Sequence, residues 1–266
     1  MRIPVIRGRI DRRILVNYRV DPDVLAAQLP APFRPKLIHG RGMAGICLIR
    51  LAGLRPAWLP AWLGISSENA AHRVAVEWDD ESGHDHPNGG GVPREGVYVR
   101  RRDTNLWFNA LVGGRLFPGI HHRARFTVDE TADRYEVAVA SDDGLTNVSV
   151  RCRRAGRLPE TSLFGSLAEA SAFFEAGSLG YSATHDPARY EGLELRCLNW
   201  RVEPLEVDAV TSSFFDDESL FPRGSIELDC ALLMRGIEHQ WHDRADLCRE
   251  PAKIPRGAQK TTAAAK

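Results

Sequence analysis

The sequence predicts a mainly β protein of the α+β class, with a curved antiparallel sheet or barrel and three short helices. About ten segments have the composition and turn spacing of strands, whereas only three short segments have helical patterns. From residue 121 onward the strands follow one another through tight turns, as in antiparallel hairpins. No internal repeat or linker interrupts residues 1–245, so we expect one domain there.

The first half of the chain contains the longest apolar runs. Three strands are predicted in it: Arg13–Val20, Met43–Leu54 and Ile65–Trp78. The run that begins at Met43 is almost wholly apolar, which indicates a strand buried on both faces. Asp21 is expected to cap a short helix with Pro22 at its first position, and Pro30 ends it. Residues 79–95 are polar and rich in glycine, and are expected to form a flexible insert.

The second half of the chain alternates short strands with turns. Asp103 is predicted to cap a helix that runs to about Val112. Ser166 and Glu169 form a capping box, which predicts another helix to about residue 175. The strands predicted in this half are Gly96–Arg100, Ala124–Val128, Tyr135–Ser141, Leu145–Arg151, Leu179–Ala183, Leu193–Val202, Val207–Phe215 and Ser225–Ile237. Residues 246–266 lack apolar periodicity and are expected to be a disordered tail.

The charge balance favours no polyanionic partner. Lys+Arg and Asp+Glu each number 35, so neither nucleic acid nor an anionic membrane is expected to bind. No apolar run reaches the roughly 20 residues of a membrane span, and the N-terminal segment lacks a signal-peptide pattern. The five cysteines are scattered and include no Cys-x-x-Cys pair, which fits a reducing compartment. We therefore expect a cytoplasmic protein.

Lysine is nearly missing from the body of the chain. Of the four lysines, Lys253, Lys260 and Lys266 lie in the C-terminal tail, and Lys36 is the fourth. Arginine cannot form an imine and is not a practical proton acceptor at neutral pH. Residues 37–252 therefore supply no amine for covalent catalysis. The triplet of arginines at 100–102 is interpreted as a solvated strand end or as salt-bridge donors.

Two loops contain candidate site residues. His84 and His86 flank Asp85, which is the pattern of a small metal site. Two histidines on a flexible loop rarely hold a metal without a third ligand, so we interpret the segment as a solvated loop. We expect neither a metal nor any other cofactor. Trp58 and Trp62 lie in one proline-rich loop. As a lid they would exclude water from a ligand; the simpler interpretation is a loop anchored by two aromatic side chains.

His121, His122 and Arg123 open a predicted strand. Adjacent strand residues point to opposite faces, so at most one of the two histidines faces the interior. Paired histidines are more often surface or structural residues than catalysts, so this motif alone assigns no function.

Three groups of residues occur in order within about residues 8–240. They are Tyr18-Arg-x-Asp21 with Leu29-Pro-x-Pro-Phe33, then Gly42 to Leu51 with Gly64-Ile-Ser-Ser-Glu68-Asn, and then Gly114-Arg115 ahead of Gly119-Ile-His-His122-Arg123. Together they resemble the acetoacetate decarboxylase superfamily, and more closely its uncharacterised YqjF-like branch. The resemblance implies a cone-like antiparallel β-barrel whose interior is the ligand site.

The resemblance also implies roles for individual positions. Glu68 stands where the decarboxylases have a pocket glutamate, and a substrate-facing arginine falls on Arg12 with a one-residue slip. Counted without gaps from Gly114, the imine-forming lysine of the family falls on His122 and a second lysine on Arg123. Histidine cannot replace the lysine as a nucleophile, but His122 can exchange a proton with Glu68 near neutral pH.

Three functional interpretations remain open. The first is a protein that binds a small carbonyl or carboxylate compound without imine chemistry. The second is a non-covalent acid–base enzyme, an isomerase, hydratase or lyase, in which His122 and Glu68 are catalytic. In such an enzyme Arg12 or Arg123 would bind the carboxylate of the substrate, and the loop with Trp58 and Trp62 would form the lid of the site. The third is a scaffold that acts through protein contacts. A small-molecule ligand is the expected partner, and a homo-oligomer is considered by analogy.

Overall fold

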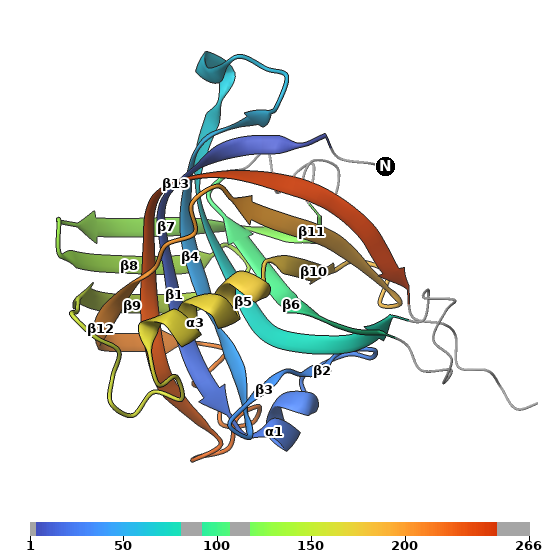
Figure 1. Cartoon of the computed structure of the whole chain (residues 1–266), viewed down its shortest axis with the longest axis vertical. Coiled ribbons are helices and arrows are strands. Elements are labelled where there is room, and N and C mark those ends of the chain that lie inside the picture. Colours follow the sequence, from blue (N-terminus) through green and yellow to red (C-terminus); the bar gives the residue numbers. More distant parts are fainter. Residues whose placement is uncertain (1–3, 81–91, 107–117, 249–266) are drawn as a thin grey trace, which may run out of the picture.

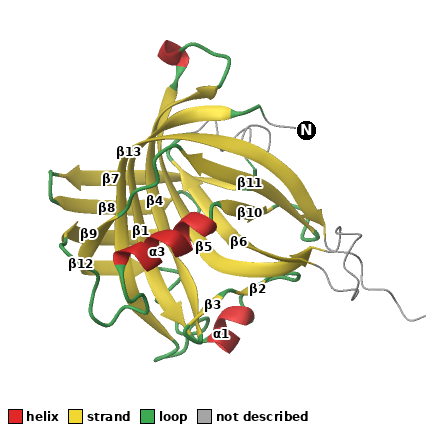
Figure 2. Ribbon diagram, in the orientation of Figure 1, coloured by secondary structure: helices red, strands yellow, loops and turns green. Residues whose placement is uncertain are grey.

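The computed structural model describes residues 4–80, 92–106 and 118–248. Thirteen strands form one hydrogen-bonded sheet that curves back on itself (Figure 1). Within these residues there are two α-helices, α1 (Pro22–Ala26) and α3 (Leu167–Ala176), and a 3-10 helix, η1 (Ala61–Leu63) (Figure 2). None of the helices that the structure describes is long and apolar enough to cross a membrane.

The strands range from two residues to more than twenty. The strands of the first half are β1 (Ile6–Val20), β2 (Arg34–Pro35), β3 (Leu37–Ile38), β4 (Arg41–Pro56), β5 (Ile65–Asp80) and β6 (Val92–Thr104). Those of the second half are β7 (His121–Glu130), β8 (Arg134–Ser141), β9 (Asn147–Arg154), β10 (Leu179–Ala183), β11 (Arg189–Cys197), β12 (Glu203–Ser212) and β13 (Ile226–Cys248). The length of β13 lets it pair with β1, β11 and β12 along different parts of its course.

The strand pairings close two rings that share the strands β13, β1, β4, β5 and β6, in that order. We call these strands the shared wall. One ring runs on from β6 through β10 and β11 and returns to β13. The other runs from β6 through β7, β8, β9 and β12 to β13. Figure 1 shows β7, β8, β9 and β12 to one side of the wall and β10 and β11 to the other.

The shared wall is buried on both of its faces. Ile14 and Leu48 pack into the same apolar cluster as Val137 of β8. Leu15, the next residue after Ile14, packs instead into the cluster that contains Phe174 of α3. Because successive strand residues point to opposite faces, β1, β4, β5 and β13 each supply both clusters, whereas β6 supplies Tyr98 to the first cluster. This arrangement explains the nearly uninterrupted apolar run of β4.

The predicted mainly β fold is confirmed, as are two helix starts. The side chain of Ser166 accepts a hydrogen bond from the backbone nitrogen of Glu169 at 3.1 Å. The side chain of Asp21 accepts from the backbone nitrogens of Asp23 and Val24. Both helices therefore begin where the capping residues indicated.

Two expectations about the sheet and its helices are wrong. The sheet is mixed, because β6 pairs in parallel with β7 and with β10. Asp103 does not cap a helix: it belongs to β6 and pairs with His122 of β7. Residues 107–112 of the predicted helix lie outside the described residues. Parallel neighbours require long crossover connections, which carry no turn signal in the sequence.

The bounds of the predicted insert and tail also change. Asp80 of β5 pairs with Val92 of β6, so strand structure extends into both ends of the segment 79–95. Likewise β13 continues to Cys248, which pairs with Arg189 of β11, into the segment predicted as a tail. Backbone pairing tolerates polar side chains at exposed strand ends. Composition alone therefore made the predicted insert and the predicted tail longer than the segments without strand pairing.

Gly45 lies where β4 and β1 approach most closely. A Cβ atom at this position would lie 2.3 Å from the carbonyl oxygen of Val16, well inside contact distance. We expect Gly45→Ala to lower the free energy of unfolding by about 1–3 kcal/mol because the two strands must separate. Urea denaturation measures this change. Gly156→Ala is the control, since a Cβ there meets nothing within 4 Å; equal losses in both variants would contradict the packing described.

Candidate functional site

The main cavity lies inside the ring that β10 and β11 close, on the face of the shared wall that packs against α3. Its volume is about 100 Å³, and every strand of that ring contributes to its lining. The described lining residues are Arg13, Cys47, Ile49, Leu51, Leu54, Ser67, Asn69, Ala70, Ala71, Arg73, Val97, Val99, Arg102, Asp103, Pro118, His121, Gly177, Ser178, Gly180, Leu193, Leu195 and Trp241. A largely apolar lining with a few polar groups is typical of a small-molecule site.

Arg13, Arg73 and Arg102 bring three guanidinium groups to this cavity from three strands. Arg102 donates through Nε to the hydroxyl oxygen of Ser182 at 3.0 Å. Arg73 donates through Nη2 to the side-chain oxygen of Asn17. Both acceptors are uncharged. Among the residues that the structure describes, neither arginine forms an ion pair with Asp or Glu.

Arg13 has sulfur and aromatic neighbours. Its Nε is 3.3 Å from Sγ of Cys47, and its Nη1 is 3.7 Å from Sδ of Met234. Its guanidinium carbon is 5.8 Å from the centre of the Trp200 ring. Sulfur is a weak acceptor, so these contacts position the side chain without neutralising its charge.

The three guanidinium groups outnumber the carboxylate of Asp103 in the cavity lining, and that carboxylate is already ion-paired with Arg101 at 3.0 Å, so the cavity is positively charged. Burial lowers the pKa of Arg73 to about 10 and that of Arg102 to about 10, so both remain protonated at neutral pH. A buried charge without a counter-charge is costly, and a nearby anion offsets the cost. The electrostatics of the cavity therefore favour an anionic ligand.

His121 adds a neutral imidazole to the same cavity. Its Nε2 is 3.3 Å from the carbonyl oxygen of Pro118. Because a carbonyl oxygen only accepts, this contact assigns the ring proton to Nε2 and the lone pair to Nδ1. Burial, together with the charge of Arg102, lowers the pKa of His121 to about 3, so the ring is uncharged at neutral pH.

Glu68 and Arg12, two of the predicted site residues, contact each other and not this cavity. Arg12 is fully buried, and its Nη2 is 2.6 Å from Oε2 of Glu68. Its Nη1 donates to Glu130 of β7 at 3.0 Å. Burial raises the pKa of Glu68, and the charges of Arg12 and Arg50 oppose that shift. Arg12, Glu68 and Glu130, which we call the Arg12 cluster, therefore form a buried ionic group, in which Nε of Arg12 has no hydrogen-bond partner among the described residues.

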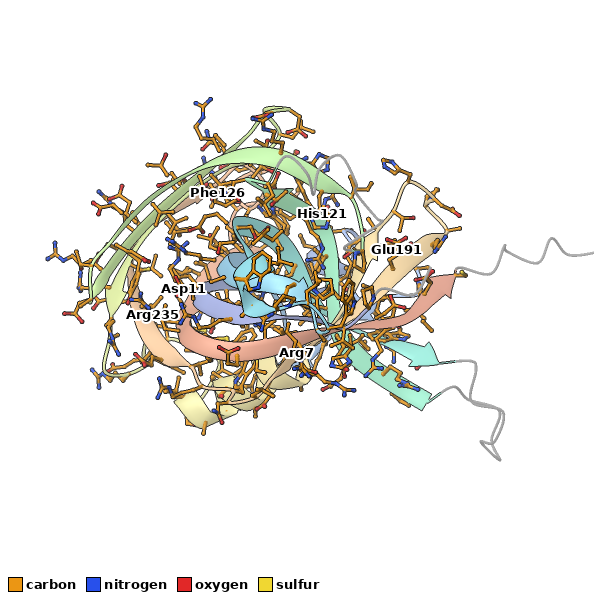
Figure 3. The ribbon with its side chains drawn as sticks, turned by 90° about the horizontal axis from the view of Figure 1, so that it is seen from above. Arg7, Asp11, His121, Phe126, Glu191 and Arg235 are labelled. Atoms are coloured by element: carbon orange, nitrogen blue, oxygen red, sulfur yellow. The ribbon has the colours of Figure 1, made fainter. Side chains whose placement is uncertain are left out.

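Figure 3 labels Asp11 and Arg235, two neighbours of this group, together with His121. Asp11 is ion-paired with Arg50 at 3.3 Å, and Arg235 lies 3.8 Å from Glu130, so both border the Arg12 cluster. Their side chains lie together in Figure 3, apart from His121.

His122 and Arg123 both bind the turn between β8 and β9. Nδ1 of His122 is 3.1 Å from Oδ2 of Asp143, and Nε of Arg123 is 3.4 Å from Oδ2 of Asp142. His122 lines a separate depression, whereas Arg123 is exposed. No hydrogen bond or ion pair joins His122 to Glu68, although the structure describes both side chains. Of the two adjacent histidines, His121 is the one that lines the main cavity.

Trp58 and Trp62 lie at the tip that joins β4 to β5. The tip protrudes from the body of the protein, at the top of Figures 1 and 2. The two residues are 74% and 80% exposed, and neither contributes to the lining of the main cavity. In this structure the indoles therefore neither cover a ligand site nor anchor the loop by burial.

Lys36 lines a smaller chamber of about 20 Å³ that shares Arg13 and Arg73 with the main cavity. Its Nζ is 2.7 Å from Oε2 of Glu95 and 4.6 Å from the centre of the Phe173 ring. The ion pair with Glu95 therefore holds the ammonium group in this chamber, and Lys36 does not line the main cavity.

The predicted histidine pair of the insert, at positions 84 and 86, lies outside the described residues. Elsewhere, in residues 4–80, 92–106 and 118–248, no three His, Cys, Asp or Glu side chains are grouped as metal ligands would be.

Arg13, Arg73, Arg102 and His121 are the cavity residues that sequence reasoning missed. One signal was available for Arg73, which interrupts the apolar run from Ala70 to Val76. An arginine within such a run must be paired or must face a cavity.

The comparisons with known proteins agree with the resemblance found in the sequence. The model of the family DUF2071, described as an uncharacterized conserved protein, matches residues 8–225. No curated protein matches the sequence. The crystal structure of acetoacetate decarboxylase from Legionella pneumophila is similar over 92% of this chain and 88% of its own, with a TM-score of 0.55 and 12% identity.

Two further solved structures are similar over nearly their whole length. The similarity to an acetoacetate decarboxylase-like enzyme from Sphingomonas wittichii extends over 94% of this chain and 94% of the enzyme, with a TM-score of 0.54 and 12% identity. The enduracididine biosynthesis enzyme MppR, complexed with pyruvate, covers 93% of this chain and 91% of its own, with a TM-score of 0.56 and 10% identity. At these identities the similarity shows that the fold is acetoacetate decarboxylase-like.

The placement of Arg12 and Arg123 predicts different consequences of their removal. Arg12→Ala leaves two carboxylates without their buried cation, so we expect a loss of about 3–5 kcal/mol in the free energy of unfolding. Arg123→Ala breaks an exposed pair and should cost about 1 kcal/mol or less. Urea denaturation at pH 7 measures both. A loss below about 1 kcal/mol for Arg12→Ala would show that its cluster is not a structural ionic group.

Proposed function

This chain belongs to the DUF2071 family of uncharacterized conserved proteins, and we propose that its main cavity binds a small carboxylate compound without imine chemistry. The observation that carries this proposal is the set of three guanidinium groups, Arg13, Arg73 and Arg102, that line one cavity without an acidic partner among the described residues. Arginine and carboxylate form short, charge-assisted hydrogen bonds that satisfy both groups.

The size and lining of the cavity narrow the class of ligand. A volume of about 100 Å³ is smaller than the ~150 Å³ cavity that accommodates benzene in an engineered protein, so the ligand has few heavy atoms. Ile49, Leu51 and Leu193 suit a methyl or short alkyl group, and the guanidinium groups suit the oxygens of a carboxylate. A short keto acid has all of these features. Pyruvate, which the structural neighbour MppR holds, is therefore a suitable probe.

The distribution of lysine supports binding without an imine. Residues 37–252 contain no lysine, and Lys36 is ion-paired with Glu95 in the adjoining chamber. Arginine side chains stay protonated and cannot take the place of a neutral amine.

The proposal predicts that Arg102→Gln weakens pyruvate binding by about 10- to 100-fold, because a charge-assisted hydrogen bond of about 1.5–3 kcal/mol is lost. Isothermal titration calorimetry on the full chain measures the affinity. 2,3-Butanedione, which has the shape of pyruvate without its charge, should bind at least tenfold more weakly to the unchanged protein.

Arg123→Gln is the matched control, because that arginine is exposed and lies outside the cavity. The proposal fails if pyruvate and 2,3-butanedione bind equally well, or if the substitutions at 102 and 123 have the same effect.

A second candidate function is proton exchange at the carbon next to the ligand carbonyl, without a covalent intermediate. The observation that favours it is the neutral imidazole of His121 in the same cavity as the three arginines. The lone pair on Nδ1 can accept a proton, and the guanidinium groups can stabilise the enolate that forms. His122 and Glu68, the residues first predicted for this role, have partners elsewhere, so His121 is the better candidate.

Deuterium exchange tests this second function. In D2O, the protein should accelerate deuterium incorporation into the methyl group of pyruvate, and His121→Phe should lower the rate by about 10²–10⁴-fold while pyruvate still binds. Since the pKa of His121 is lowered to about 3, its contribution should not change between pH 5 and 8. Proton NMR of the methyl signal measures the rate.

His122→Phe is the control and should leave the exchange rate unchanged. Borohydride added with pyruvate should leave the protein mass unchanged, since no imine forms. Exchange no faster than in buffer would leave binding as the function, and a reduced adduct at Lys36, which lines the adjoining chamber, would overturn both proposals.

A further inference from the structure

A second depression opens on the opposite face of the shared wall. It lies between β5, β6 and β7, the β8–β9 turn and the segment that joins β12 to β13, and its volume is about 270 Å³. The residues that the argument needs are His72, Arg100, Arg101, His122, Leu145 and Phe214. None of these six lines the main cavity.

His72 is a buried polar side chain that lines this depression. It is 3% exposed, and neither ring nitrogen has a hydrogen-bond partner in the described part of the chain. Its ring lies against Phe214 and Phe215, with centroids 5.5 Å and 5.8 Å away. Burial lowers its pKa to about 4, so it is a neutral donor and acceptor at pH 7. Buried polar groups without partners are rare, and each points to a missing hydrogen bond.

Arg100 supplies an uncommitted positive charge at the same place. Its guanidinium carbon is 5.0 Å from the centre of the Phe214 ring. It forms no ion pair with any acidic residue that the structure describes. Arg101 differs, because it is held by Asp103 and by Asp143 at 2.8 Å. Of the two guanidinium groups in the depression, that of Arg100 is therefore available to an anion.

An apolar surface completes the depression. Leu145 of the β8–β9 turn is 70% exposed at its rim, and the Phe214 ring carries the guanidinium of Arg100 on its face. Arg101 and His122 are paired with Asp143, so the groups left for a ligand are the cation of Arg100, the neutral imidazole of His72 and two apolar side chains. This combination suits a molecule with a carboxylate at one end and a flat apolar group at the other.

We propose that this depression is a second ligand site, which binds an aromatic monocarboxylate between Arg100 and His72. The carboxylate accepts hydrogen bonds from Arg100 and from the imidazole, and the ring packs against Phe214 and Leu145. This inference goes beyond the function proposed for the main cavity and does not depend on it, since the two sites share none of the residues named.

The test uses 4-fluorobenzoate with the full chain, followed by fluorine NMR. Saturable binding is expected, and the uncharged analogue 4-fluorobenzamide should bind at least tenfold more weakly. Arg100→Gln should raise the dissociation constant tenfold or more, and Arg100→Lys should retain part of the affinity because it keeps the charge. His72→Phe, which removes both nitrogens but preserves a flat ring, should weaken binding several-fold.

Two further variants locate the binding. Arg125→Gln, an exposed arginine of β7, is the matched surface control and should leave the affinity unchanged. Arg102→Gln alters the main cavity and should change 4-fluorobenzoate binding by less than twofold. Thermal unfolding of each variant shows whether it is folded. The inference is overturned if 4-fluorobenzoate does not bind, if Arg100→Gln binds as well as Arg125→Gln, or if Arg102→Gln abolishes binding while Arg100→Gln does not.

Discussion

Burial of the shared wall on both faces is the constraint on which the rest of this structure depends. Along the buried stretches of these strands, successive residues enter one of two interiors, whereas charged residues such as Arg9, Arg50 and Arg100 lie where the wall is exposed. Arg12 enters one interior and is neutralised by Glu68 and Glu130. Arg13, the next residue, enters the other interior and meets sulfur atoms and a cavity. Strand alternation alone thus separates a structural cation from one available to a ligand.

Most of the fold could be predicted from the sequence, but the cavity residues could not. Most strand segments, the helix caps at Asp21 and Ser166, and the family resemblance depend on local patterns, and these are confirmed. Which face of the sheet a side chain points to depends on the strand register, and a β-bulge changes that register. Such a shift occurs between Ile10 and Arg12 in the pairing of β1 with β4. Since both faces of the wall are apolar, no alternation of polar and apolar residues reveals such a shift. The family resemblance therefore selected His122 by a gapless count and Arg12 with a one-residue slip, whereas their neighbours Arg13 and His121 line the cavity.

Arginine serves two different purposes in this protein, and composition does not distinguish them. Where carboxylates are close, as at Arg12 or Arg101, the side chain joins strands that are distant in sequence. Where only neutral acceptors are close, as at Arg73 and Arg102, the charge remains available. The scarcity of lysine was informative from the sequence because residues 37–252 supply no lysine for imine formation. Whether a guanidinium group is available to a ligand depends on its neighbours in three dimensions, which composition does not give.

Arg100 has no Cα partner on β5, because His72 pairs with Arg101 and Arg73 pairs with Val99. It is the extra residue of a bulge, and Val99 and Arg102 on either side of it both face the main cavity. Deletion of Arg100 would make the pairing of β5 with β6 regular. It would keep Val99 and Arg102 in the lining of the main cavity and remove a cation from the opposite face of β6. Evolution can therefore alter one face of β6 through chain length alone, without substituting any residue of the other face.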